Sequence, residues 1–362
     1  MTIRLTWKRA GAALLGIVLA ALLFAWSGIF NIAASSGHWA VTEWFLHWTM
    51  RNSVKTHSFF DSPKDPIATD GQLVSAAGHF AAACATCHGA PGQRPSPVMQ
   101  KAMPPAPDLS VNAAQWTDGQ LFYILRHGVK YSGMPAWGAE GRDDEIRRMV
   151  AFVRRLPGMT PARYRALAGE AQGAGITDVR ALGSNVLAGC VACHGEDGRG
   201  RGQPDIPVLG GQRAGYLEAA LAAYADGRRA SAVMGNAAAV LTPAERRALA
   251  RHFAAMPGIG PGIEPGTGQA TPQGDPRARV IVERGLPERQ LPACASCHGA
   301  GKPQPVLAGQ RATYIAARLR YWKGDGKEID ARLPQNVMPV IARRIPEELI
   351  DPLARYLAGN TR

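Results

Sequence analysis

The sequence predicts a mostly α-helical protein, with three helical units in tandem behind one N-terminal membrane-spanning helix. Three observations predict this fold class. First, a five-residue pattern, Cys-x-x-Cys-His, occurs three times with its first cysteines 106 and then 104 residues apart, a regularity that indicates internal repetition. Second, each repeat closes with an amphipathic helical pattern, and no unit contains strand-like alternation of useful length. Third, an uncharged and strongly apolar run begins near the N-terminus.

The apolar run predicts a membrane anchor. Residues 10–34 carry no charged side chain, and Arg4, Lys8 and Arg9 precede them. A spanning helix needs about 20 apolar residues, whereas the core of a signal peptide has about 7–15, so the length favours a span. We therefore expect residues 1–34 to form a cytoplasmic tip and a single transmembrane helix, with the cationic flank keeping the N-terminus inside. A cleaved signal peptide with a long core is the alternative.

Residues 35–70 are expected to form an interfacial, juxtamembrane segment. One face of a helix in this segment, at helical spacing, carries Val41, Trp44, Phe45 and Trp48. Aromatic rings favour the boundary between membrane and water, so this face is expected to contact lipid. A docking face for a membrane-bound partner is the alternative.

The charge balance favours acidic partners without identifying one. The chain has a formal net charge of +13, which attracts anionic lipid, nucleic acid or an acidic protein face. The arginines are scattered, however, and no nucleic-acid-binding signature is visible. We therefore expect no nucleic acid among the partners.

Other features recur in step with the cysteine pattern and set the expected domains. A Pro-x-Leu follows each pattern, a methionine comes later, and an aromatic residue lies in each closing helix. The expected units are 71–160, 179–258 and 277–362, and the dense glycine and proline of 259–276 predict a linker between the last two. The recurring residues are Pro107, Leu109, Met134 and Phe152; Pro207, Leu209, Met234 and Phe253; Pro305, Leu307, Met338 and Tyr356.

The Cys-x-x-Cys-His pattern has several chemical interpretations. A thioredoxin-type redox dithiol needs a βαβ context, which is missing. A zinc site needs four ligands, and each cluster offers at most three. A disulfide framework fits an exported chain with six cysteines, but it does not explain a histidine directly after the second cysteine in all three copies.

Covalent haem attachment explains the whole pattern. Two thiols add to the two vinyl groups of one haem, and the next histidine lies on the same helical turn, where it can ligate the iron. We therefore predict three haem c groups. The predicted attachment cysteines are Cys84, Cys87, Cys190, Cys193, Cys294 and Cys297, and the predicted proximal iron ligands are His88, His194 and His298.

The sixth iron ligand separates electron transfer from small-molecule chemistry. An open iron face binds oxygen or peroxide, while a face closed by a thioether passes electrons at a raised potential. Met134, Met234 and Met338 occupy comparable positions in the three units and are the predicted distal ligands. A single methionine is otherwise ordinary core filler.

The Pro-x-Leu segments predict the surroundings of each histidine. A ligating imidazole usually donates its other N–H to a carbonyl, and the carbonyls of Pro107, Pro207 and Pro305 are the expected acceptors. The leucines Leu109, Leu209 and Leu307 are expected on the haem face. A guanidinium matches a carboxylate well, so Arg213 and Arg311 are candidate propionate partners, with a surface role as the alternative.

These motifs together resemble the class I c-type cytochromes. Residues 179–362 are similar to the paired domains of cytochrome c4, through "GCVACHGEDGRGRGQPDIPVLGGQ" and "PACASCHGAGKPQPVLAGQ". Residues 71–160 resemble single-haem respiratory-chain domains, through "APDLS", "DGQLFYILRHG" and "GMPAWG". There are two departures: cytochrome c4 usually lacks a membrane span, and Pro352 is expected to shorten or kink the last helix.

The resemblance implies electron transfer between a quinol- or substrate-oxidising complex and a terminal oxidase or reductase. We therefore expect a triheme electron carrier of a bacterial-type respiratory chain rather than an enzyme. The expected location is the inner membrane, single-pass, with the haem domains in the periplasm and redox proteins as partners. The alternatives are the cytochrome subunit of a membrane dehydrogenase complex and, third, a haem enzyme with one open coordination site.

Overall fold

The fold is built from helices and loops. The computed structural model describes residues 6–29, 31–61, 73–169, 184–259, 275–324 and 337–359. Within these ranges there is no strand, and only two isolated β-bridges pair short turns. The predicted mostly α-helical class is therefore confirmed. The predicted linker at 259–276 lies almost entirely outside the described residues.

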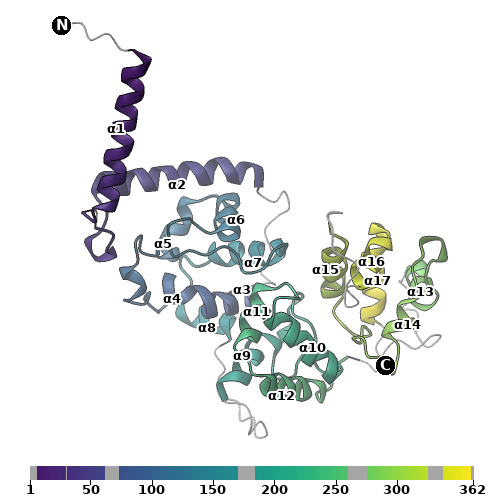
Figure 1. Ribbon diagram of the computed structural model, residues 1–362. Coiled ribbons are helices and arrows are strands. Elements are labelled where there is room, and N and C mark those ends of the chain that lie inside the picture. Colours follow the sequence, from purple (N-terminus) through teal and green to yellow (C-terminus); the bar gives the residue numbers. More distant parts are fainter. Residues whose placement is uncertain are drawn as a thin grey trace.

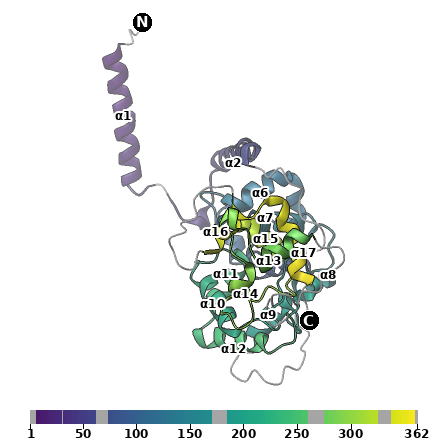
Figure 2. The same cartoon turned by 90° about the vertical axis from the view of Figure 1, so that its right-hand side faces the viewer.

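Helix α1 (Trp7–Trp26) stands apart from the rest of the protein in both views (Figures 1 and 2). Its N-cap is Thr6, whose hydroxyl accepts from the backbone N–H of Arg9. The helix has 20 residues and a mean hydropathy of 2.0, and none of its residues is buried. It is therefore long and apolar enough to cross a membrane, a property that a signal sequence shares.

Helix α2 (Ala40–Asp61) lies across α6, as Figure 1 shows. Its inner face buries Val54 and Ser58. At its C-terminal end the carboxylate of Asp61 accepts hydrogen bonds from Arg126 at 3.1 Å and His127 at 2.5 Å. These contacts fix α2 against the helices that follow it.

The described helices after α2 surround three large hydrophobic clusters. We call the described segments around them unit 1 (73–169), unit 2 (184–259) and unit 3 (275–324 and 337–359). Unit 1 contains α3 (Leu73–His79), α4 (Ala85–His88), α5 (Leu109–Asn112), α6 (Asp118–His127), α7 (Asp143–Val153) and α8 (Pro161–Ala168). Unit 2 contains α9 (Ser184–His194), α10 (Ala214–Ala225), α11 (Ala232–Ala239) and α12 (Pro243–Ala254). Unit 3 contains α13 (Pro276–Glu283), α14 (Cys294–His298), α15 (Ala312–Lys323), α16 (Val337–Arg344) and α17 (Glu347–Gly359).

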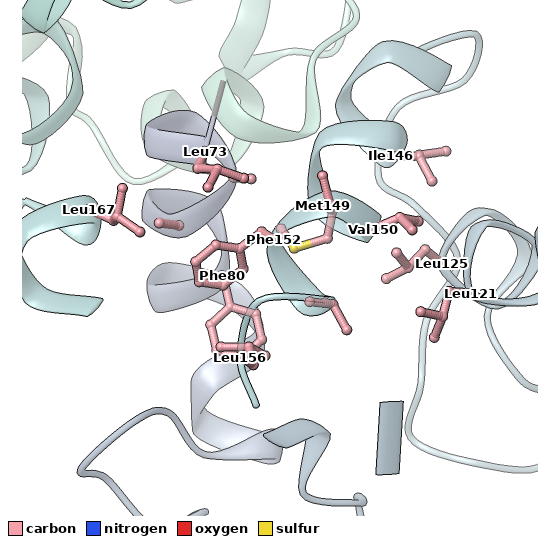
Figure 3. Packing of buried hydrophobic residues seen from close by; sticks show 14 of the residues in the cluster. Leu73, Phe80, Leu121, Leu125, Ile146, Met149, Val150, Phe152, Leu156 and Leu167 are labelled. Atoms are coloured by element: carbon pink, nitrogen blue, oxygen red, sulfur yellow. The ribbon is translucent and has the colours of Figure 1, made fainter. Parts of the chain in front are cut away.

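The core of unit 1 is centred on aromatic rings from two helical segments. Phe80 and Phe152 are almost fully buried, with ring centroids 5.2 Å apart (Figure 3). Helix α7 carries Phe152 and begins with Asp143, Asp144 and Glu145, whose negative charges suit the positive N-terminal end of a helix dipole. The closing helix predicted from sequence is thus present and packed.

The closing helices of the other two units are also present. Helix α12 begins at a capping box in which Thr242 and Glu245 satisfy each other's backbone N–H groups. Helix α17 continues through Pro352, so the expected shortening at this residue is wrong. Pro352 removes only the hydrogen bond to a first-turn carbonyl, and the buried neighbours Ile350 and Leu353 hold the helix on the core.

Candidate haem-binding sites

Each Cys-x-x-Cys-His pattern lies on a helical turn at the edge of a core. Helices α4, α9 and α14 all end at the histidine of the pattern. Because residues three and four apart share a helix face, both thiols and the imidazole are presented to the same side. The first cysteine of each unit, Cys84, Cys190 or Cys294, packs against the core of its own unit.

The thiols do not resemble a redox dithiol. All six cysteines are free in the structure. Burial raises the pKa of Cys84, Cys190 and Cys294 to about 11 in each case. Catalytic dithiols need the opposite shift, toward a stable thiolate. The described part of the chain also contains no cluster of three His, Cys, Asp or Glu side chains suited to a metal ion alone. These observations disfavour the thioredoxin-like and zinc interpretations.

The hydrogen bond expected at the proximal histidine is present in units 1 and 3. Nδ1 of His88 donates to the carbonyl of Pro107 at 2.8 Å, and Nδ1 of His298 donates to that of Pro305 at 2.7 Å. A carbonyl oxygen only accepts, so Nδ1 carries the proton and Nε2 keeps a free lone pair. This is the tautomer that binds a metal through Nε2.

His194 differs from the other two histidines. Its side chain is buried, and burial lowers its pKa to about 4, although the nearby Pro207 carbonyl acts in the opposite direction. Its Nδ1 makes no hydrogen bond of good geometry within the described residues. The neutral form is therefore strongly favoured, which is the form that a metal ligand requires.

The leucines of the three Pro-x-Leu segments border the cores beside the cysteines. Leu109, Leu209 and Leu307 are half-buried, and each packs against the hydrophobic cluster of its own unit. Their predicted place on a haem face remains a prediction.

The three predicted distal methionines are half-buried but occupy different local structures. Met134 lies in the loop after α6 and packs against the unit 1 core. Met338 lies in the first turn of α16 and packs against the unit 3 core. Met234 lies in the first turn of α11, where its N–H donates to Ser231. Iron ligation by these sulfur atoms remains a prediction.

The candidate propionate partners contact backbone instead. Arg213 of unit 2 donates to the carbonyls of Gly299, at 2.9 Å, and Gln304 in unit 3. Arg311 of unit 3 donates to the carbonyl of Ile206 in unit 2 at 2.9 Å. Both guanidinium groups thus join units 2 and 3, and a role beside a propionate stays a prediction.

Two glutamines that the sequence analysis did not single out form a reciprocal contact between units 2 and 3. The amide of Gln212 exchanges hydrogen bonds with the backbone of Val306, at 2.9 and 3.1 Å. Gln310 does the same with Val208, at 2.9 Å in both bonds. The signal was present in the sequence, because Gly-Gln-Arg follows the Pro-x-Leu at the same offset in both units.

The donor set of each unit fits a covalently attached haem. Two cysteines and one neutral or Nδ1-protonated imidazole lie on one turn, and a half-buried methionine and leucine lie in the same unit. In a haem, the porphyrin supplies four nitrogen ligands to the iron, so the protein has to supply only the axial ligands. A helical fold with this donor set defines a haem c protein.

Comparison with known proteins agrees with this class. Residues 71–153 match the family model described as cytochrome c oxidase, cbb3-type, subunit III, and residues 181–256 match cytochrome c. The chain belongs to the c-type cytochromes, and tandem cytochrome c4-like domains fit its second half.

Individual relatives point to the same group. The chain is 35% identical to a thiosulfate dehydrogenase electron acceptor of Thiomonas intermedia (strain K12), over 48% of this chain and 79% of that one. It is 30% identical to cytochrome c4 of Thiocapsa roseopersicina, over 47% of this chain and 86% of that one. The solved cytochrome c4 of Acidithiobacillus ferrooxidans is 33% identical over 47% of this chain and 97% of that one, with a TM-score of 0.38.

Proposed function

We propose that this chain carries three haem c groups, one in each unit, and works as an electron carrier. The observation that carries the proposal is the threefold recurrence of a helical turn with two free thiols and a histidine at the edge of a separate core. The proposed iron ligands are His88 with Met134, His194 with Met234, and His298 with Met338.

The residues of the chain suit electron transfer rather than catalysis. When bound, haem supplies an iron that alternates between ferrous and ferric states. The Nδ1 hydrogen bonds of His88 and His298 hold the rings in one orientation, which limits reorganisation when the iron changes charge. A thioether from Met134, Met234 or Met338 would close the iron to small ligands and would favour a raised potential.

The proposed location is the inner membrane, with the three units in the periplasm. The length and apolar composition of α1 support a single span, and Arg4, Lys8 and Arg9 support a cytoplasmic N-terminus. Helix α2 supports a position at the membrane surface, because Trp44 and Trp48 are 64% and 53% exposed and stack on its outer side.

The proposed partners are redox proteins of a respiratory chain. A tether keeps the carrier near membrane complexes and raises its effective concentration there. The resemblance of unit 1 to respiratory-chain domains supports delivery towards a terminal oxidase or reductase.

A second candidate is the cytochrome subunit of a dehydrogenase complex. The name of the Thiomonas relative, thiosulfate dehydrogenase electron acceptor, favours it and suggests thiosulfate, which is oxidised as it gives up electrons, as the ultimate electron source. Purification of the full chain from its membranes under mild detergent decides between the two. A stably bound catalytic subunit supports the second candidate, and copurification with a terminal oxidase or reductase supports the first.

Single replacements of the three methionines test the carrier function. Each of Met134→Ala, Met234→Ala and Met338→Ala is expected to convert one haem to a high-spin form that binds cyanide rapidly and has a lower potential. Met256→Ala is the matched control, since this half-buried methionine packs near the unit 2 core but is no proposed ligand. An unmodified protein that binds cyanide rapidly at one haem would support the enzymatic alternative and contradict the carrier.

A further inference from the structure

The second cysteine of unit 2 lies directly against unit 1. A Cβ atom placed on Gly78 of α3 would lie 3.0 Å from the sulfur of Cys193, which is the atom that it would meet outside the backbone of its own helix and its chain neighbours. Cys193 also packs against the hydrophobic core of unit 1, together with Ile206 of unit 2. The absence of a side chain at Gly78 therefore permits this close approach.

The contact distinguishes unit 2 from its counterpart in the same chain. Cys297 is the equivalent second cysteine of unit 3, and it is exposed. Cys193 is half-buried, with α3 of unit 1 against it. Cys87, the second cysteine of unit 1, is half-buried as well, so partial burial alone does not distinguish unit 2; the distinguishing feature of Cys193 is that residues of another unit lie against it.

Two buried polar contacts hold the docked position. On one side, Asp205 of unit 2 accepts from Arg148 at 2.7 Å and from Ser75 at 2.6 Å, and its side chain is 8% exposed. On the other side, Glu145 of unit 1 accepts from the hydroxyl of Ser231 at 2.6 Å. These contacts fix the relative position of the two surfaces, because separation would leave the buried Asp205 without the guanidinium of Arg148 and would remove the hydrogen bond from Ser231 to Glu145.

Glu145 is joined to unit 2 by a second bond and is itself paired. The backbone N–H of Ala232 donates to it at 2.9 Å, and Arg142 forms an ion pair with it at 2.8 Å. Arg142 also donates to the carbonyl of Ala230 at 2.8 Å. The N-terminal turn of α7 thus binds the segment that begins α11, which contains the predicted ligand Met234.

The docking helix leads without a break to the cysteine pattern of unit 1. Helix α3 passes through a π-helical turn, Phe80–Cys84, into α4, so residues 73–88 form one helical segment. The same segment therefore contacts Cys193 near one end and presents Cys84, Cys87 and His88 at the other. No intervening loop separates the two sites.

We propose that the contact between Gly78 and Cys193 is the electron-exchange contact between units 1 and 2, which makes unit 2 an internal relay. This inference rests on the proposed function, because it requires a haem in each unit. A thioether cysteine is bonded to the edge of its macrocycle, so with haem attached at Cys193 the segment around Gly78 would lie beside the attachment point. One electron leaves the ferrous iron of one unit and reduces the ferric iron of the other, with no bond broken and no proton transferred.

Unit 2 also contacts unit 3, through residues next to those that meet unit 1: Ile206 packs in the unit 1 core, and its carbonyl accepts from Arg311 of unit 3. At this contact with unit 3, the reciprocal glutamines bond to Val208 and Val306, the central residues of the two Pro-x-Leu segments. Unit 2 is thus in contact with unit 1 through its cysteine turn and with unit 3 through the segment after its histidine. External partners would exchange electrons with units 1 and 3, and unit 2 would connect them.

Substitution of Gly78 in the full-length chain tests the proposal. Gly78→Ala and Gly78→Leu both place a Cβ atom 3.0 Å from the sulfur of Cys193, and both residues favour a helix more than glycine does. We expect the intramolecular rate of electron redistribution after rapid partial reduction to fall several-fold in Gly78→Leu and less in Gly78→Ala. Gly215→Leu is the matched control, because Gly215 is an exposed helical glycine with nothing within 4 Å.

The haem content, measured first, separates this proposal from the proposed function. Fewer than three haem groups in the unsubstituted chain would contradict the proposed function. If every variant carries three haem groups and the rate of intramolecular electron redistribution is the same in all of them, the relay is wrong. The proposed function is then unaffected. Resonance Raman bands of the unit 2 haem supply a second readout, and we expect them to shift in Gly78→Leu only. If Gly78→Leu does not fold, the rate in Gly78→Ala decides.

Discussion

Asp144, in the first turn of α7, is an acidic residue held between two guanidinium groups. Burial would raise its pKa, but the hydrogen bond from Arg142 and the charge of Arg148 outweigh it and lower the pKa from 3.8 to about 2. The folded state therefore binds its proton less readily than the unfolded state does. The stabilisation is complete above about pH 4 and is lost as the pH falls from there to about 2.

Asp144→Asn is expected to remove this part of the acid dependence. The variant should be less stable than the unsubstituted chain at neutral pH, and the two should converge between about pH 4 and pH 2. Thermal unfolding of the full chain, recorded by far-UV circular dichroism at several pH values, measures the difference. A constant difference down to pH 2 would show that Asp144 does not stabilise unit 1 through its charge.

At the residue scale, local spacing predicted the contacts that lie within one unit. The Pro-x-Leu segment follows its histidine closely, so the carbonyl acceptors of His88 and His298 were predictable. The partners of Arg213 and Gln212 lie in another unit, 86 and 94 residues away, and no local pattern identifies them. His194 shows a third case, since the same motif is present but the hydrogen bond is not.

At the scale of single helices, α7 shows how a closing helix holds its unit together. Phe152 is fully buried and packs on Phe80 and Tyr164. Phe152→Ala is expected to destabilise unit 1 by about 3–5 kcal/mol, because it removes a large side chain and leaves a cavity. Hydrogen exchange of the α3 and α7 amides measures this loss of stability. Phe59→Ala, at an 82% exposed position, is the control and should change little. Equal protection in both variants would contradict the assigned core.

Helix α2 permits a test that is independent of the span. A chain beginning at residue 38 should still bind vesicles that contain anionic lipid, because Trp44, Phe45 and Trp48 are exposed on its outer face. Replacing Trp44 and Trp48 with serine should weaken partition by about 2 kcal/mol per side chain, or roughly thirtyfold each. Cosedimentation measures this partition. Tyr131→Ser, which removes an aromatic side chain that is 92% exposed in unit 1, is the control. Unchanged partition would favour a protein partner for this face.

Helices were predictable where periodicity and end signals agreed. The helix α12 carries Thr242 and Glu245 at the spacing of a capping box, with a proline between them and an apolar face after it. The shortening predicted at Pro352 is wrong, although a proline in a helical pattern usually marks the end of a helix. Tertiary packing overrides it here: Tyr356 is only 9% exposed, and its hydroxyl donates to Glu283 at 3.3 Å.

At the scale of the whole molecule, the reciprocal glutamines give a paired prediction. Gln212→Ala should leave the backbone groups of Val306 without their hydrogen-bond partner, and Gln310→Ala should do so for Val208. Each unsatisfied group should lower the stability by about 1–3 kcal/mol. Hydrogen exchange should therefore accelerate at the Val306 amide in the first variant and at the Val208 amide in the second. Exchange that accelerates at both amides in both variants would instead indicate that the interface opens as one body.

The repetition in the sequence predicts three units but says nothing of how they are arranged. A repeat indicates that the same unit is built again, and three large hydrophobic clusters are present. The contact of Gly78 with Cys193 and the pairing of Arg148 with Asp205 depend on surfaces that differ between the units. Repetition therefore contains no information about these contacts, and only the folded structure reveals them.

The proposed electron carrier requires covalently attached haem in every unit. The measurement is the intact mass of the mature polypeptide after extraction with acidified acetone, which removes haem that is not covalently bound. We expect the mass of the polypeptide plus three haem groups, with one group lost for each pair of cysteines replaced by alanine. A mass equal to that of the bare polypeptide would contradict the central claim.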